Sequence, residues 1–189
     1  MNSKTKNIVG IGLFTAIVLV LQFLGGSIRF GMFSISLVLV PIVVGAAVYG
    51  WQAGAWLGFV FGIAVLMSGD AAAFLAVDVL GTILTVLVKG TAAGLSTGFM
   101  YKLMSKFLNK YLSVIIAAIA CPIVNTGVFL LGCRLFFFET ITAWGTAAGF
   151  ANAASYMFIG LAGVNFLIEL ATNLLLSPVI VRLISFAKK

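Results

Sequence analysis

The sequence predicts an all-α integral membrane protein, a bundle of six transmembrane helices with both the N and the C terminus on the cytoplasmic side. The chain of 189 residues is 63% hydrophobic and 8% charged, with a mean hydropathy of +1.26, a composition far from that of soluble globular domains. Apolar stretches long enough to cross a hydrocarbon core of about 30 Å follow one another with short connections. Most basic residues stand at the ends of these stretches. The chain is therefore expected to be a multi-pass protein of the cell (plasma) membrane, surrounded by lipid.

The apolar stretches form one expected membrane domain over residues 1–189, with no linker or low-complexity tract between them. Because the second and third stretches are joined only by VYGWQAG, they should form a tight helical hairpin, and Pro41 should kink the second or loosen its hydrogen-bond ladder. The six stretches are expected at about 8–25, 33–50, 51–68, 79–104, 112–136 and 157–184.

The positions of Lys and Arg predict the orientation. With six spans, eight of the eleven basic residues fall on the side that carries both termini. Cytoplasmic loops are enriched in Lys and Arg, so this side should be cytoplasmic. The eight residues are Lys4, Lys6, Lys102, Lys106, Lys110, Arg182, Lys188 and Lys189.

One lysine, Lys89, stands inside the fourth stretch, where a charge is costly. It lies 13 residues before Lys102, and Glu169 lies 13 residues before Arg182, so both side chains should be about 20 Å along their helices from the basic end. Three amides are expected in the same layer: Asn125 from the fifth stretch, and Asn165 and Asn173 one turn on either side of Glu169.

Two interpretations of this polar layer stay open. Lys89 and Glu169 could form a salt bridge that only fixes the register of two helices. Alternatively, the layer is the floor of a cavity open to the outside, in which Lys89, Arg29 or Arg134 binds a ligand carboxylate or phosphate. The outer loops are rich in aromatic residues and poor in charge, which suits an organic molecule better than an ion.

Small residues recur every four positions in three stretches. They predict close helix–helix contacts in the third and fourth stretches, while the pair Gly12 and Ala16 in the first could also dock a partner. The other residues of this kind are Gly54, Gly58, Gly62, Gly90, Gly94 and Gly98.

Several classes of function are not expected. The chain has no His and no evident nucleophile–base pair, so we expect neither catalysis, nor a metal, nor a cofactor. The basic residues are accounted for by topology, so a nucleic-acid partner is not expected. There is no nucleotide-binding motif, so uphill transport would need an ATPase in another protein. The alternative is a small stand-alone channel or secondary carrier that uses Lys89 and Glu169.

Four segments together resemble the substrate-binding S components of energy-coupling factor (ECF) vitamin transporters. They are GIGLFTAIVLVLQFL, VLVKGTAAGLSTGFMYKLM, CPIVNTGVFLLG and NFLIELATNLLLSPVIVRLI. The resemblance implies a subunit that binds a vitamin from outside and then joins a transmembrane coupling subunit and two cytoplasmic ATPase subunits. It implies that Gly12 and Ala16 contact the coupling subunit. It also implies a pocket built from the last three helices and covered by the loop GGSIRFGMFS, involving Lys89, Asn125, Glu169 and Asn173.

The embedded and near-mouth cations favour a ligand with an acidic group. Pantothenate is therefore the first expected substrate, followed by folate, lipoate or a pyridoxine-like compound.

Overall fold

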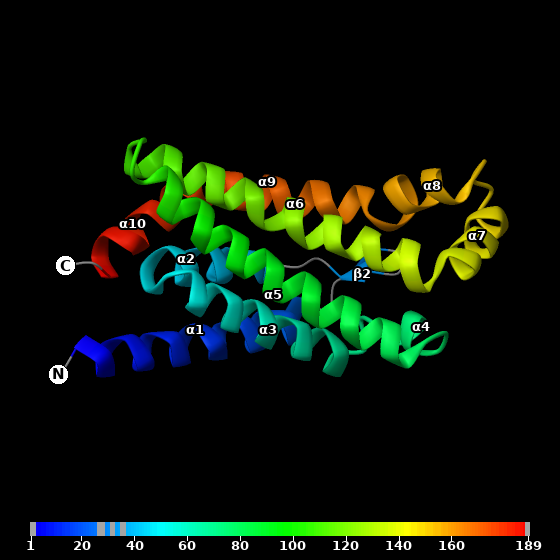
Figure 1. The fold of residues 1–189 in the computed structure, drawn as a ribbon, viewed down its shortest axis with the longest axis horizontal. Coiled ribbons are helices and arrows are strands. Elements are labelled where there is room, and N and C mark those ends of the chain that lie inside the picture. The colour runs from blue at the N-terminus through cyan, green and yellow to red at the C-terminus, as the bar shows by residue number, and fades with distance from the viewer. Residues whose placement is uncertain (1–2, 26–28, 31–32, 35–36, 188–189) are drawn as a thin grey trace.

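The computed structural model describes residues 3–25, 29–30, 33–34 and 37–187. It is a bundle of long helices with one short β-hairpin, and both termini lie at the same end (Figure 1). The short helices α4, α7 and α8 lie at the other end. In chain order the elements are α1 (Ser3–Gly25), β1 (Arg29–Phe30), β2 (Phe33–Ser34), α2 (Leu39–Tyr49), α3 (Trp51–Met67), α4 (Ala72–Leu75), α5 (Val79–Met104), α6 (Lys110–Phe136), α7 (Phe138–Ala147), α8 (Ala153–Ser155), the π-helix η1 (Tyr156–Leu161), α9 (Gly163–Leu175) and α10 (Ser177–Ala187).

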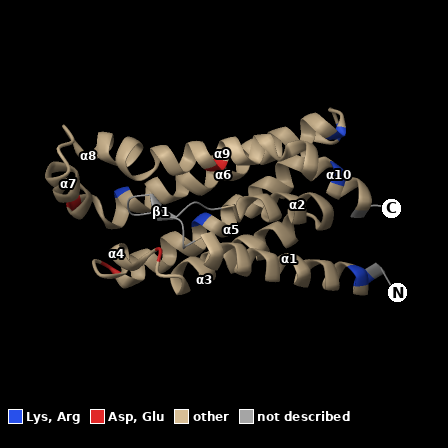
Figure 2. Cartoon of the chain, turned by 180° about the vertical axis from the view of Figure 1, so that it is seen from behind, with Lys and Arg blue, Asp and Glu red and all other residues tan. Residues whose placement is uncertain are grey.

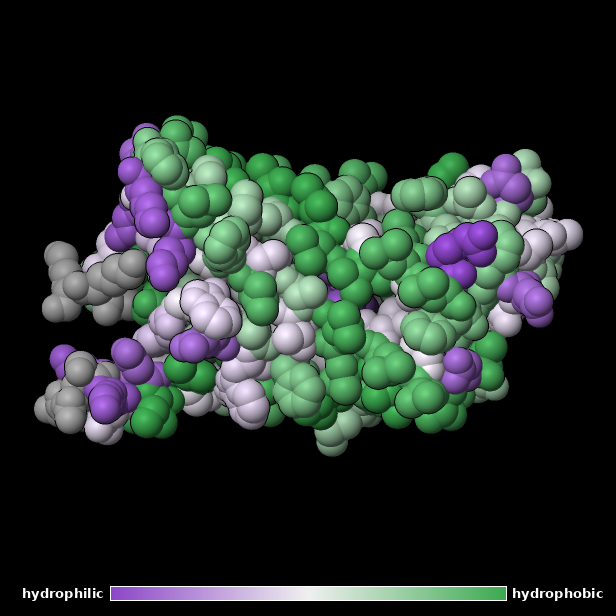
Figure 3. Space-filling model, in the orientation of Figure 1, coloured by the Kyte–Doolittle hydropathy of each residue, from purple (hydrophilic) through white to green (hydrophobic). Residues whose placement is uncertain are grey.

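The length and hydropathy of the helices agree with a membrane bundle. In the described part of the chain, four helical segments are long and apolar enough to cross a membrane, namely α1, α5, α6 and the run Ala153–Leu175. Helices α2, α3 and α10 are apolar but shorter. Apolar side chains cover the middle of the molecule and hydrophilic ones gather towards its two ends (Figure 3).

Helix α5 covers the stretch expected at 79–104, and its start has a clear local cause. The side chain of Asp78 accepts a hydrogen bond of 3.0 Å from the backbone N–H of Gly81 and so caps the helix. Helix α6 begins in the same way, because the side chain of Asn109 accepts from the N–H of Leu112 at 2.9 Å.

The second expected span differs from the structure in two respects. Residues Phe33–Ser34 form β2, which pairs antiparallel with β1, and α2 begins only at Leu39. The alternation of apolar and polar residues in FSIS is typical of a strand. Pro41 lies in the first turn of α2, where a backbone N–H has no helical partner, so its missing N–H removes no hydrogen bond from the helix. Gly50, at φ +94°, is the single residue between α2 and α3.

The last expected span, 157–184, consists of three helical segments. The π-helix η1 ends at Leu161, α9 ends at Leu175, and α10 follows after Leu176. Pro178 contributes to the second break because it has no N–H for the carbonyl of Leu174, four residues earlier. The hydroxyl of Ser177 donates to the carbonyl oxygen of Asn173 at 2.8 Å across this break.

Helices α3 and α5 pack backbone against backbone, as the glycine pattern predicts. A Cβ atom on Gly54 would overlap the carbonyl oxygen of Gly94, and one on Gly58 would overlap that of Gly90. One turn further along, a Cβ on Gly62 would lie 2.9 Å from the carbonyl oxygen of Val86. The glycines therefore permit a contact that side chains would prevent.

Charge divides the two ends of the bundle. Most basic residues lie at the end that holds the termini, and most acidic residues lie at the end of α4 and α7 (Figure 2). By the positive-inside rule the end with the termini faces the cytoplasm, which leaves α4, α7 and α8 outside. A cluster of buried aromatic and apolar side chains closes this outer end, among them Phe74, Phe137, Ile141 and Tyr156.

Candidate substrate-binding site

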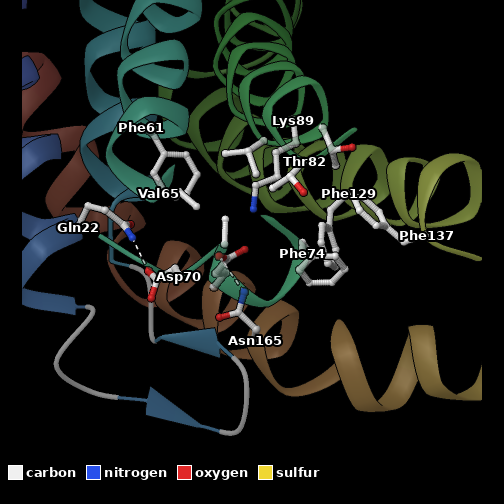
Figure 4. A pocket seen from close by; sticks show the side chains of 14 residues that line it. Gln22, Phe61, Val65, Asp70, Phe74, Thr82, Lys89, Phe129, Phe137 and Asn165 are labelled. Carbon is white, nitrogen blue, oxygen red and sulfur yellow. Dashed lines mark hydrogen bonds between the residues drawn. The ribbon is translucent and has the colours of Figure 1, made fainter. Parts of the chain in front are cut away.

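A cavity lies inside the bundle, in the half nearer the outer end. It is lined by side chains from α1, α3, α4, α5, α6 and α9 and has a volume of about 50 Å³. Its wall combines aromatic rings with a few converging polar groups, a combination typical of sites for small organic ligands. Figure 4 shows the lining side chains Gln22, Phe61, Val65, Asp70, Ala71, Phe74, Thr82, Thr85, Val86, Lys89, Phe129, Phe137, Asn165 and Glu169.

Lys89 projects from α5 into this cavity (Figure 4). Its Nζ lies 5.3 Å from the centroid of the Phe129 ring and 5.8 Å from that of Phe61. These distances allow cation–π attraction from two helices, α6 and α3. Among the described residues, none is an acidic partner of Lys89 within 4.0 Å. The ammonium group therefore faces the cavity with hydrogen-bonding capacity to spare.

Glu169 on α9 is held by two amides. Its Oε1 accepts a hydrogen bond from Asn165 Nδ2 at 3.1 Å, and its Oε2 accepts one from Asn125 Nδ2 at 3.4 Å. The side chain is only 2% exposed, and each of these bonds offsets part of the cost of burying a carboxylate. Asn165 lies one turn before Glu169 on α9 and Asn125 lies on α6, so these two hydrogen bonds fix the position of the Glu169 side chain.

The outer end of α1 is tied to the loop between α3 and α4 beside the cavity. Gln22 Nε2 donates to Asp70 Oδ2 at 2.5 Å and to Ser68 Oγ at 3.2 Å. Gln22 is 2% exposed although it lies near the end of α1. Both Gln22 and Asp70 line the cavity, so helix α1 contributes directly to its wall.

The polar layer expected from the sequence is present only in part. Lys89, Asn165 and Glu169 line the cavity. Asn125 does not line the cavity, but its side-chain amide donates a hydrogen bond to the carboxylate of Glu169. Asn173 is fully buried one turn further along α9, and its amide has no hydrogen-bond partner among the described residues.

The two expected arginines differ in what the structure describes of them. The side chain of Arg29 lies outside the described residues, although its backbone belongs to β1. Arg134 is exposed near the end of α6, with its guanidinium carbon 4.0 Å from the centroid of the Phe138 ring, and it does not line the cavity. The expectation that Arg134 could contact the ligand therefore stays a prediction.

Sequence reasoning missed much of the cavity wall. Gln22 lies in an apolar helix, and its contribution depends on a loop more than 40 residues away. Phe61, Phe74 and Phe129 come from three different helices. In these apolar helices the sequence periodicity does not distinguish the side that faces the cavity from the side that faces lipid. A signal existed for Asp70 alone, as a rare acidic residue in an outer loop.

The fold and the cavity define a class of protein: a small multi-pass membrane protein with a cavity among its helices that is lined by aromatic and polar side chains. A family model described as "ECF transporter, substrate-specific component" matches residues 6–181. The chain belongs to this family and is the substrate-binding component of an ECF transporter, which associates with an energizing module and is not itself an enzyme. This membership replaces the alternative of a stand-alone channel or carrier. No curated protein matches the chain.

Proposed function

We propose that this S component captures a small organic acid from outside the cell, with pantothenate as the first candidate and folate, lipoate or a pyridoxine-like compound after it. One observation carries the proposal: the Lys89 ammonium group faces the cavity, and none of the described residues is an acidic partner within 4.0 Å. A ligand carboxylate would form a charge-assisted hydrogen bond with it. The aromatic rings around Lys89 would strengthen that bond by excluding water.

The remaining polar groups of the wall suit the rest of such a ligand. Glu169 and Asp70 can accept hydrogen bonds from ligand hydroxyl or amide groups, and Asn165 offers an amide beside them.

The interpretation that Lys89 and Glu169 only form a salt bridge between two helices is disfavoured, because both line the cavity without forming an ion pair within 4.0 Å. Both charges thus remain available to a ligand.

Ligand binding requires the cavity to widen. A volume of about 50 Å³ holds a few water molecules, whereas small-molecule sites usually measure about 300–1,000 Å³. Phe61, Phe74 and Phe129 form the aromatic wall of the cavity, and we infer that a ligand displaces these rings when it enters. We therefore expect the ligand to increase the order of these rings when it binds.

A matched pair of ligands tests the substrate proposal. Pantothenate and its alcohol analogue differ only in the group that should meet Lys89, so the purified protein should bind pantothenate at least about tenfold more tightly in calorimetric titrations. Equal affinities would contradict the role of Lys89. If neither binds, the same titration with folate, lipoate and pyridoxal phosphate shows whether another acid is the ligand, and binding of none would overturn the proposed substrate class.

We also propose that the energizing module consists of a coupling subunit in the membrane and two cytoplasmic ATPase subunits, and that α1 meets the coupling subunit through Gly12 and Ala16. Both residues are exposed, and a Cβ on Gly12 would have no atom within 4 Å. Small residues at this spacing allow a second helix to approach closely. These contacts support an open docking face on α1.

The double variant Gly12→Leu with Ala16→Leu should retain ligand affinity within about twofold and lose assembly with the energizing module, because the new side chains hold the partner helix away. Co-purification with the tagged module measures assembly. The variant Gly127→Leu is the control, since Gly127 is equally open on α6 and should not affect assembly. Normal assembly of the double variant would remove Gly12 and Ala16 from the interface.

A further inference from the structure

A surface groove lies at the cytoplasmic end of the bundle, between the start of α3 and the last turns of α5. Its volume is about 460 Å³. It is separate from the substrate cavity and shares no lining residue with it. Its wall consists of Trp51, Leu95, Phe99, Lys102, Leu103 and Lys106.

The apolar part of the groove faces outward. Trp51 is 41% exposed and Phe99 is 55% exposed. Trp side chains prefer the level of the lipid headgroups, and Trp51 begins α3 at the cytoplasmic end. Leu95 and Phe99 lie deeper along α5, where acyl chains run. The groove therefore crosses from the headgroup level into the hydrocarbon region.

The two lysines add a cationic end to this groove. Lys102 lies in the last turn of α5, Lys106 follows four residues later, and both are exposed. The chain has four acidic residues, and none is near them. Asp78 is 24 residues before Lys102 on the same helix, which is about 36 Å away. Asp70 and Glu139 lie towards the same outer end as Asp78, and Glu169 is in the substrate cavity.

From this arrangement we propose that the groove binds an anionic phospholipid of the inner leaflet. Its phosphate would lie between Lys102 and Lys106, and one acyl chain would run along Leu95 and Phe99. Basic pockets between helices on the cytoplasmic side are suited to anionic headgroups. No acidic side chain of the protein offsets the charge of the two lysines, so this charge selects an anionic headgroup. The aromatic wall of the groove holds the acyl chain of the lipid.

Lipid competition in nanodiscs tests this proposal. The protein is placed in discs with equal amounts of phosphatidylglycerol and phosphatidylcholine, and the lipids that remain bound after release are counted by native mass spectrometry. The wild type should retain phosphatidylglycerol preferentially. The variant Lys102→Gln with Lys106→Gln should lower that preference about tenfold or more, given the usual contribution of each lysine near an anionic surface.

A matched control separates the groove from general surface charge. The variant Lys4→Gln with Lys6→Gln removes the same charge from the same end of the bundle and should keep the preference of the wild type. Phe99→Ala should weaken retention while both lysines remain, which distinguishes a bound lipid from a free phosphate.

Two results would overturn the proposal. One is an equal loss of preference in both lysine pairs, which would show a diffuse charge effect. The other is a Lys102 and Lys106 variant that keeps its lipid preference but no longer assembles with the energizing module, which would make the groove a protein contact.

Discussion

Replacing Lys89 by methionine is expected to weaken binding of the acidic ligand at least about tenfold while the protein still folds. Methionine keeps much of the length and the apolar stem of lysine but removes the ammonium group that faces the cavity. Folding should survive because none of the described residues forms an ion pair with Lys89 within 4.0 Å. Calorimetric titration and thermal unfolding of the same sample measure the two quantities.

The control for this prediction is Lys6→Met, which removes the same charge from the exposed start of α1 and should bind like the wild type. Loss of folding in Lys89→Met, with no change of affinity in the fraction that remains folded, would instead assign Lys89 a role in helix register.

Replacing Gly58 by leucine is expected to prevent stable folding. A side chain at this position would overlap the carbonyl group of Gly90 on α5, and the Cα of Thr91 would lie 3.2 Å from its Cβ. Backbone atoms cannot move aside like the end of a side chain, so we expect a loss of at least about 3 kcal/mol. The yield of monodisperse protein and its midpoint of thermal unfolding measure the effect.

Gly127→Leu is the control for this second prediction, because a Cβ on Gly127 of α6 would have no atom within 4 Å. It should fold normally. A Gly58→Leu protein as stable as this control would show that α3 and α5 are farther apart than described, and the argument from the glycine pattern would fail.

The helices that the sequence predicted well are those with local determinants. Helix α5 begins after a capping Asp78 and carries Lys102 in its last turn, and both features can be recognised without knowledge of the rest of the fold. The facing glycines of α3 and α5 could be predicted for the same reason, since their spacing is visible in each helix alone.

The elements that the sequence did not predict depend on tertiary context. Strand β2 occupies the first two residues of the expected second span, 33–50. The last expected span is divided into three helical segments, and at the second break the hydroxyl of Ser177 donates to the carbonyl oxygen of Asn173. Within the site, charge inside a membrane identified Lys89 and Glu169. The bond between Gln22 and Asp70 could not be predicted, because a helix and a distant loop meet there only after folding.

The central claim is that the cavity around Lys89 captures a small organic acid. Native mass spectrometry of the purified wild-type protein, released from detergent, tests it most directly. We expect a single small molecule with a carboxylate or phosphate group to be bound one to one, and to be absent from Lys89→Met. A neutral or cationic molecule retained equally by both proteins, or an empty protein that conducts ions in liposomes, would contradict the claim.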